Sequence, residues 1–153
     1  MPWLTTGALL MAAFAAQALW GWRWEWLAGL QANELYKQLT GLALVLFVMM
    51  QWRLSVARMG SASPATRLLA VHRDQGALAP LLLYLHAIAL GHAYIRVMSL
   101  AFLGLVTLGL LHGPITRLNR NWVNTAWLVT HVALAAMLVL LIGYHAFNAF
   151  YYE

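Results

Sequence analysis

The stretch VNTAWLVTHVALAAMLVLLIGYHAFNAF, from Val123 to Phe150, is a long apolar run that carries two histidines, His131 and His145. About 20 apolar residues are enough for a helix to cross a membrane, so we predict a membrane-spanning helix here. The two histidines are 14 residues apart. In a helix this spacing returns the second ring to within about 40° of the first, about 21 Å along the axis. Both rings therefore fit inside one hydrocarbon core, which is about 30 Å thick.

A second apolar stretch repeats this spacing. His72 and His86 are also 14 residues apart, within a span expected to run from about Leu68 to His92. Two such helices facing each other would present two imidazoles at each of two depths. A haem iron held by two imidazoles has no open position, which favours electron transfer over oxygen chemistry. The four histidines therefore predict a transmembrane b-type cytochrome with two haem b groups.

The composition is that of an integral membrane protein. Of 153 residues, 63% are hydrophobic and only 8% are charged, and the mean hydropathy is +0.73. A soluble domain is usually about one-quarter charged. The apolar stretches are continuous rather than alternating, so we predict an all-α bundle in one domain over residues 1–153. The chain has no cysteine, which excludes disulfides, thiol redox chemistry and iron–sulfur ligation.

Five membrane spans are expected along the chain. Their approximate bounds are Trp3–Trp20, Tyr36–Trp52, Leu68–His92, Val97–Leu111 and Val123–Phe150. No Lys or Arg precedes the first span, so we expect a retained helix rather than a cleaved signal peptide.

The basic residues of the connections predict the orientation. Six lie after the second and fourth spans, namely Arg53, Arg58, Arg67, Arg73, Arg117 and Arg120. Three lie in the other connections, namely Arg23, Lys37 and Arg96. Because basic residues are enriched in cytoplasmic loops, the amino terminus is expected in the cytoplasm and the carboxyl terminus outside. The net charge of +5 is thus attributed to topology in a bacterial cytoplasmic membrane, with lipid as a partner and without nucleic-acid binding.

The residues beside the histidines leave two interpretations open. Gly76, Ala79 and Gly143 are small enough to let a flat macrocycle approach the backbone, or they serve ordinary packing between membrane helices. Arg73, next to His72, either pairs with a haem propionate or is a positive charge at the cytoplasmic interface.

Two further histidines do not follow the paired spacing. His92 is six residues from His86, about 240° around a continuous helix, and is expected at the outer interface. His112 is expected at the inner interface, with a quinone-related or proton-transfer role left open. The first outer connection is rich in tryptophan, which indicates an aromatic belt or a docking surface for an external partner; these residues are Trp20, Trp22, Trp24 and Trp26.

Several short segments resemble the ferric reductase-like transmembrane domain over about residues 36–150. They are Gln38-Leu39-Thr40-Gly41, Arg67-Leu68-Leu69-Ala70-Val71-His72-Arg73, Leu85-His86, Trp127-Leu128-Val129-Thr130-His131 and Tyr144-His145-Ala146. That family includes ferric reductases, NADPH oxidases and the bacterial haem-binding subunit of the methionine sulfoxide reductase system. The resemblance implies two stacked b haems, the inner one held by His72 with His131 and the outer one by His86 with His145.

The chain shows no self-sufficient active site. No Gly-rich phosphate loop is present, and we find no carboxylate pair or nucleophile with a base, so we assign no catalytic residue. We therefore expect an electron-transfer subunit of a larger redox assembly, with a quinol pool, a soluble flavoprotein or another subunit as the donor. The alternatives are a quinol-oxidising cytochrome b, which shares the histidine spacing, and a haem-free transporter or structural subunit.

Overall fold

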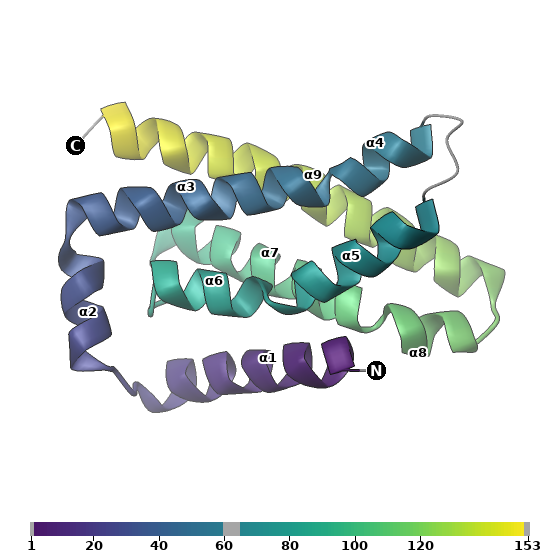
Figure 1. The fold of residues 1–153 in the computed structure, drawn as a ribbon, viewed down its shortest axis with the longest axis horizontal. Helices are drawn as coiled ribbons and strands as arrows, with labels where there is room; N and C mark the ends of the chain where they lie inside the picture. Colours follow the sequence, from purple (N-terminus) through teal and green to yellow (C-terminus); the bar gives the residue numbers. More distant parts are fainter. Residues whose placement is uncertain (1, 60–64, 152–153) are drawn as a thin grey trace. The chain divides into compact units, whose positions relative to one another are not determined.

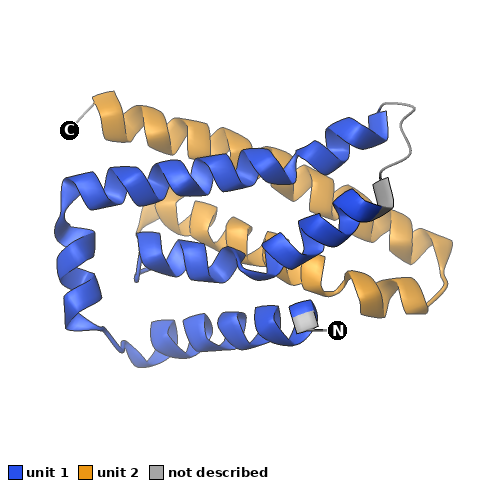
Figure 2. Cartoon of the chain, in the orientation of Figure 1, with its two compact units in different colours: residues 1–89 blue, residues 90–153 orange. Residues whose placement is uncertain are grey.

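The computed structural model describes residues 2–59 and 65–151, and within these ranges the chain is helical without strands (Figure 1). It divides into two compact units, residues 1–89 and residues 90–153, coloured separately in Figure 2. The all-α prediction is thus confirmed for the described residues, and each unit is taken by itself below.

The first unit holds six helices. They are α1 (Pro2–Trp20), α2 (Glu25–Ala32), α3 (Glu34–Gln51), α4 (Arg53–Met59), α5 (Ala65–Ala77) and α6 (Ala79–His86). The short helix α2 was not expected, because it lies in the tryptophan-rich connection. Asn33 separates it from α3, and its side-chain oxygen accepts a hydrogen bond from the Tyr36 backbone nitrogen at 3.1 Å. Asparagine is favoured at such N-cap positions because it satisfies a backbone donor that the helix leaves open.

Helices α5 and α6 lie between α1 on one side and α3 with α4 on the other (Figures 1 and 2). Small side chains make this close packing workable: Ala77 and Ala79, at the junction of α5 and α6, are each only 2% exposed. Ala79 is thus a packing residue inside the unit. Of the two interpretations open for it, helix packing is the one that its burial supports.

The expected third span, Leu68–His92, is not one continuous helix. The helix is interrupted at Leu78, and α6 ends at His86, after which Ala87 is extended with φ −147° and ψ 123°. Pro80, in the first turn of α6, explains the interruption, because proline has no N–H for the preceding turn and its ring crowds that turn.

This break corrects two predictions that assumed a straight helix. The helical rotation of about 100° per residue applies only to an unbroken helix, so it cannot show that His72 and His86 lie on the same face. The same holds for the angle between His86 and His92. His92 is instead the exposed N-cap residue of the next helix, α7 (Ala93–Leu110).

Four helical segments in the described residues are long and apolar enough to cross a membrane. They are Trp3–Trp20, Glu34–Met59, Ala93–Leu110 and Asn121–Tyr151. They correspond to the first, second, fourth and fifth expected spans, whereas α5 and α6 are each too short to count alone. Large apolar side chains are widely exposed, with Leu19 at 82% and Leu140 at 74%, as expected for surfaces that face lipid.

The second unit is built on two long antiparallel helices. Besides α7 it contains α8 (His112–Arg117) and α9 (Asn121–Tyr151), and α7 packs along α9. A side chain added at Gly109 would meet His131, and one added at Gly104 would meet Leu134, so residue numbers fall on α7 as they rise on α9. Glycines at both points allow the two backbones to approach closely.

Candidate metal-binding histidines

His86 is the last residue of α6, and its ring packs directly against α3. Its Nδ1 lies 3.0 Å from the Thr40 hydroxyl oxygen. A Cβ atom added to Gly41 would lie 3.2 Å from the His86 Cε1, closer than ordinary contact. The adjacent pair Thr40 and Gly41 therefore provides a hydrogen bond and the space for the ring.

The contacts of the Thr40 hydroxyl favour one tautomer of His86. Its oxygen lies 2.8 Å from the Tyr36 carbonyl and 3.2 Å from the Lys37 carbonyl, to which it donates. A hydroxyl has only one hydrogen; when that hydrogen is directed to the Tyr36 carbonyl, the oxygen accepts from His86 and Nδ1 is the donor. The lone pair of the neutral imidazole is then on Nε2. Metal-bound histidines commonly have this arrangement, with the other N–H donated to an oxygen that orients the ring.

Side chains from two other helices hold the end of α6. The Gln31 amide nitrogen donates to the carbonyls of Tyr84 at 2.8 Å and Leu85 at 3.1 Å, and its oxygen accepts from the Ile88 backbone nitrogen at 3.2 Å. The Tyr36 hydroxyl donates to the Leu85 carbonyl at 3.0 Å. The last carbonyls of a helix have no partner within it, and an unsatisfied backbone group is costly inside a membrane. These contacts therefore stabilise the position from which His86 projects.

His72 faces the junction between α3 and α4. It is half-buried and lines a small pocket with Gln51, Leu54 and Gln75. The Gln51 amide nitrogen also donates to the Gln75 side-chain oxygen at 3.3 Å. His72 thus lies near the C-terminal end of α3, whereas His86 contacts α3 near its middle, at Thr40 and Gly41.

Arg73 points toward α1. Its guanidinium carbon lies 5.1 Å from the centroid of the Trp3 ring, which is a cation–π contact. This contact was not foreseen in either interpretation of Arg73. No atom lies within 4 Å of a Cβ added at Gly76 or Gly143, so at those two positions the described structure shows open space rather than tight helix packing.

In the second unit, His145 lies on α9 beside Tyr94 of α7. The His145 Nδ1 is 3.4 Å from the Tyr94 hydroxyl oxygen, and the two ring centroids are 6.1 Å apart. Tyr144 packs edge-on against the same tyrosine, with centroids 5.0 Å apart. His145 therefore has a hydroxyl at Nδ1, as His86 does.

His131 is stacked on a tryptophan one helical turn before it. The ring centroids of His131 and Trp127 are 5.4 Å apart and their planes differ by 24°. The Trp127 indole nitrogen donates to the Leu108 carbonyl at 2.8 Å, which fixes the indole against α7. A Cβ at Gly109 would lie 3.8 Å from the His131 Cε1. His112 packs on the same indole, with ring centroids 4.8 Å apart, and is half-buried; its position at the inner interface stays a prediction.

The structure thus places all four paired histidines in half-buried positions, two in each unit. His131 and His145 share the continuous helix α9, so their predicted spacing along one axis is retained. The pairing of a histidine from one unit with a histidine from the other stays a prediction. Within the described ranges, no group of three His, Asp or Glu side chains forms a metal site; a haem iron needs only two.

Sequence reasoning assigned no role to three of the residues that position these rings, namely Gln31, Tyr36 and Tyr94. Thr40, Gly41 and Trp127 were noticed only as parts of resembling segments. Comparison of the chain with models of protein families, with characterised proteins and with solved structures finds no match.

Proposed function

We propose that this protein is a transmembrane b-type cytochrome that carries electrons between the two faces of a bacterial cytoplasmic membrane. The inner haem iron would be held by His72 and His131, and the outer one by His86 and His145. The single observation that carries the proposal most is the hydrogen bond between Thr40 and His86, because it favours a half-buried imidazole with its lone pair on Nε2.

Both proposed outer ligands have a hydroxyl oxygen at Nδ1. Thr40 supplies it to His86 and Tyr94 supplies it to His145. When Nδ1 donates a hydrogen bond to such an oxygen, the orientation of the imidazole ring is fixed and Nε2 becomes a better metal ligand.

Two glycines make room for the proposed ligands. Gly41 and Gly109 leave backbone rather than side chain beside the rings of His86 and His131. A bound haem supplies one-electron redox chemistry. The residues of this chain would hold the iron, orient the imidazoles and keep water away, which is also how a protein tunes such a centre.

We further infer five membrane crossings, with α5 and α6 together forming the third as a kinked helix. The 13 residues of α5, the 8 of α6 and Leu78 between them reach about 33 Å at about 1.5 Å per residue. That length is sufficient for a hydrocarbon core of about 30 Å. Basic residues are concentrated around the junction of the second and third crossings, with Arg67 and Arg73 on α5 itself, and after the fourth crossing; this supports an amino terminus in the cytoplasm.

The proposal includes membership of a larger redox assembly, because the proposed haems would give electrons a route and we identify no site for a terminal reaction among the described residues. A quinol pool, a soluble flavoprotein or another subunit would supply the electrons. The resemblance to the ferric reductase-like domain agrees with this role.

The visible spectrum of the purified full-length protein tests the proposal. We expect a sharp α band and a shifted Soret band on reduction with dithionite, about two haems per chain, and a low-spin signal with two imidazole ligands by electron paramagnetic resonance. Expression with excess haem precursor ensures that haem supply is not limiting. A well-folded protein that stays colourless under these conditions would overturn the proposal in favour of a haem-free transporter or structural subunit.

A further inference from the structure

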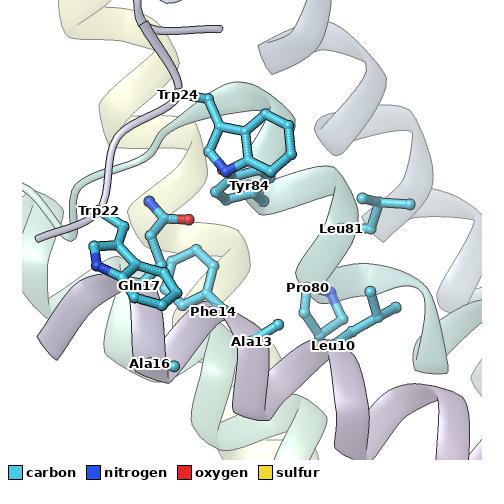
Figure 3. Close-up of a pocket in the computed structure, with 10 residues that line it drawn as sticks. All are labelled: Leu10, Ala13, Phe14, Ala16, Gln17, Trp22, Trp24, Pro80, Leu81 and Tyr84. Carbon is cyan, nitrogen blue, oxygen red and sulfur yellow. The ribbon is translucent and has the colours of Figure 1, made fainter. Parts of the chain in front are cut away.

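A cavity of about 340 Å³ opens within the first unit, beside the helix that carries His86 (Figure 3). Its walls come from α1, from the connection between α1 and α2, and from α6. This volume is at the small end of the range for small-molecule sites, which suits a single ring system rather than a large cofactor. Neither the histidine constellation nor the resembling segments pointed to it.

The lining of the cavity favours a neutral, planar ligand. Its ten lining residues include no charged side chain. Four are aromatic: Phe14, Trp22, Trp24 and Tyr84. Phe14 and Tyr84 meet edge to face, with ring centroids 6.4 Å apart, so one wall is formed by packed rings. Aromatic side chains pack well against other flat rings through stacked or edge-on contacts.

One polar group belongs to this apolar site. Gln17 is only 8% exposed, and its amide nitrogen lies 3.5 Å from the Ile88 carbonyl, to which it donates. Figure 3 shows the amide between Trp22 and Tyr84, with its oxygen directed toward the space that the lining residues enclose. An amide oxygen accepts hydrogen bonds, so the ligand should carry a hydroxyl.

We propose that this cavity binds the head group of a membrane quinol, an aromatic ring that carries hydroxyls and a hydrocarbon tail. The ring packs among Trp22, Trp24 and Tyr84, and a ring hydroxyl donates to the Gln17 oxygen. The tail leaves past Trp22 and Trp24, which are 67% and 59% exposed. A lipid acyl chain would cover the Gln17 oxygen without offering a donor, and a sterol offers a hydroxyl but no aromatic ring.

The choice of a redox-active ring rests on the proposed function, because Tyr84 precedes the proposed ligand His86 by two residues on α6. The binding itself requires no haem. Quinol binding is therefore measured in its own experiment, apart from the visible spectrum of the haems, on the same protein samples.

The test uses the full chain in detergent and decylubiquinol kept reduced under nitrogen. Binding is followed by quenching of tryptophan fluorescence and confirmed by equilibrium dialysis. Ala13 lines the cavity, so Ala13→Phe should fill it and weaken binding at least tenfold. Ala15→Phe is the matched control, since Ala15 lies on the same helix, is exposed and is not part of the lining. Trp22→Phe and Trp24→Phe together should remove most of the quenching.

Gln17→Leu tests the hydrogen bond. We expect about tenfold weaker binding of the quinol, the size of one lost hydrogen bond, and little change for its dimethyl ether, which cannot donate. Because Gln17→Leu also removes the contact to Ile88, the Ala13→Phe result stands as the independent measurement if this variant fails to fold.

Three outcomes overturn the quinol site: no binding by the wild type, equal loss in Ala13→Phe and Ala15→Phe, or equally tight binding of cholesterol or oleate. A protein with two haems and no quinol binding contradicts only the cavity proposal. A colourless protein that binds the quinol contradicts only the haem proposal.

Discussion

The Nδ1 of His86 and the hydroxyl of Thr40 are 46 residues apart in the sequence and 3.0 Å apart in the structure. The same hydroxyl donates to the Tyr36 carbonyl one turn earlier on α3. A threonine proton held by the helix backbone favours the His86 tautomer that has its proton on Nδ1. In that tautomer the lone pair of Nε2 is the one that can accept a metal.

Replacing Thr40 with valine keeps the shape of the side chain and removes the hydroxyl. Outer-shell partners of metal-bound histidines typically contribute about 10- to 100-fold in affinity. We therefore expect Thr40→Val to lose the outer haem during purification, and to raise the reduction potential of any that remains, because a less basic imidazole stabilises the ferric iron less. Haem content and a redox titration measure both effects. Thr40→Ser should restore wild-type values; if it does not, the hydroxyl is not the cause.

Gly41 tests whether the His86 ring needs the space beside α3. A Cβ there would lie 3.2 Å from the ring, so we expect Gly41→Leu to displace His86 and leave about one haem per chain. Gly29→Leu is the control, because no atom lies within 4 Å of a Cβ at Gly29. Haem is counted by the pyridine haemochrome assay. Two haems in Gly41→Leu would show that His86 is not a ligand.

The pairing of the histidines is tested by single alanine variants. His86→Ala and His145→Ala should each remove the same haem, and His72→Ala and His131→Ala should each remove the other, because each iron needs two imidazoles. Redox titration identifies the remaining haem by its midpoint. His92→Ala should keep both haems, since His92 is exposed outside the helices. Loss of a haem in His92→Ala would require a different set of ligands.

Trp127 is expected to hold the His131 ring in its orientation. In Trp127→Leu the stacked indole is lost, and we expect a broadened or shifted low-spin signal from the inner haem by electron paramagnetic resonance. In Trp127→Phe the stacking is retained while the bond to the Leu108 carbonyl is lost, at a cost of about 1 kcal/mol. That variant should unfold at lower temperature but keep its spectrum. Equal spectra in all three proteins would argue against an orienting role.

Gln31 is expected to be the main stabilising residue at the end of α6. Gln31→Leu leaves the Tyr84 carbonyl and the Ile88 amide without this partner, which typically costs about 1–3 kcal/mol for a buried group. Thermal unfolding followed by circular dichroism in detergent measures the loss. Gln38→Leu provides the comparison, because Gln38 is exposed on α3. A similar loss in both variants would indicate a general effect of the substitution.

Much of the helical framework could be predicted because the signals are local. Four expected spans coincide with helical segments that are long and apolar enough to cross a membrane. The break in the third was also present in the sequence, as Pro80 within an apolar stretch. The prediction failed there because apolar periodicity was given more weight than a single helix-breaking residue.

The positioning residues of the site could not be derived in the same way. Tyr94 and His145 are 51 residues apart, and Gln31 and Tyr84 are 53 apart. Nothing in the pattern around Gln31 distinguishes it from Gln38, although one caps α6 and the other is exposed. Such contacts depend on how helices pack in space.

The sequence by itself determined that the chain is helical and suited to a membrane, and that His131 and His145 share one continuous helix. The length of a span, its apolar character and the absence of a helix breaker depend only on residues that are neighbours in the sequence. They can therefore be predicted without knowing how the helices pack. Only the tertiary structure decided that His86 lies at a helix end against Thr40 and Gly41, and that His131 stacks on Trp127. A contact of about 3 Å requires two helices to meet at a particular register, which depends on all the side chains between them.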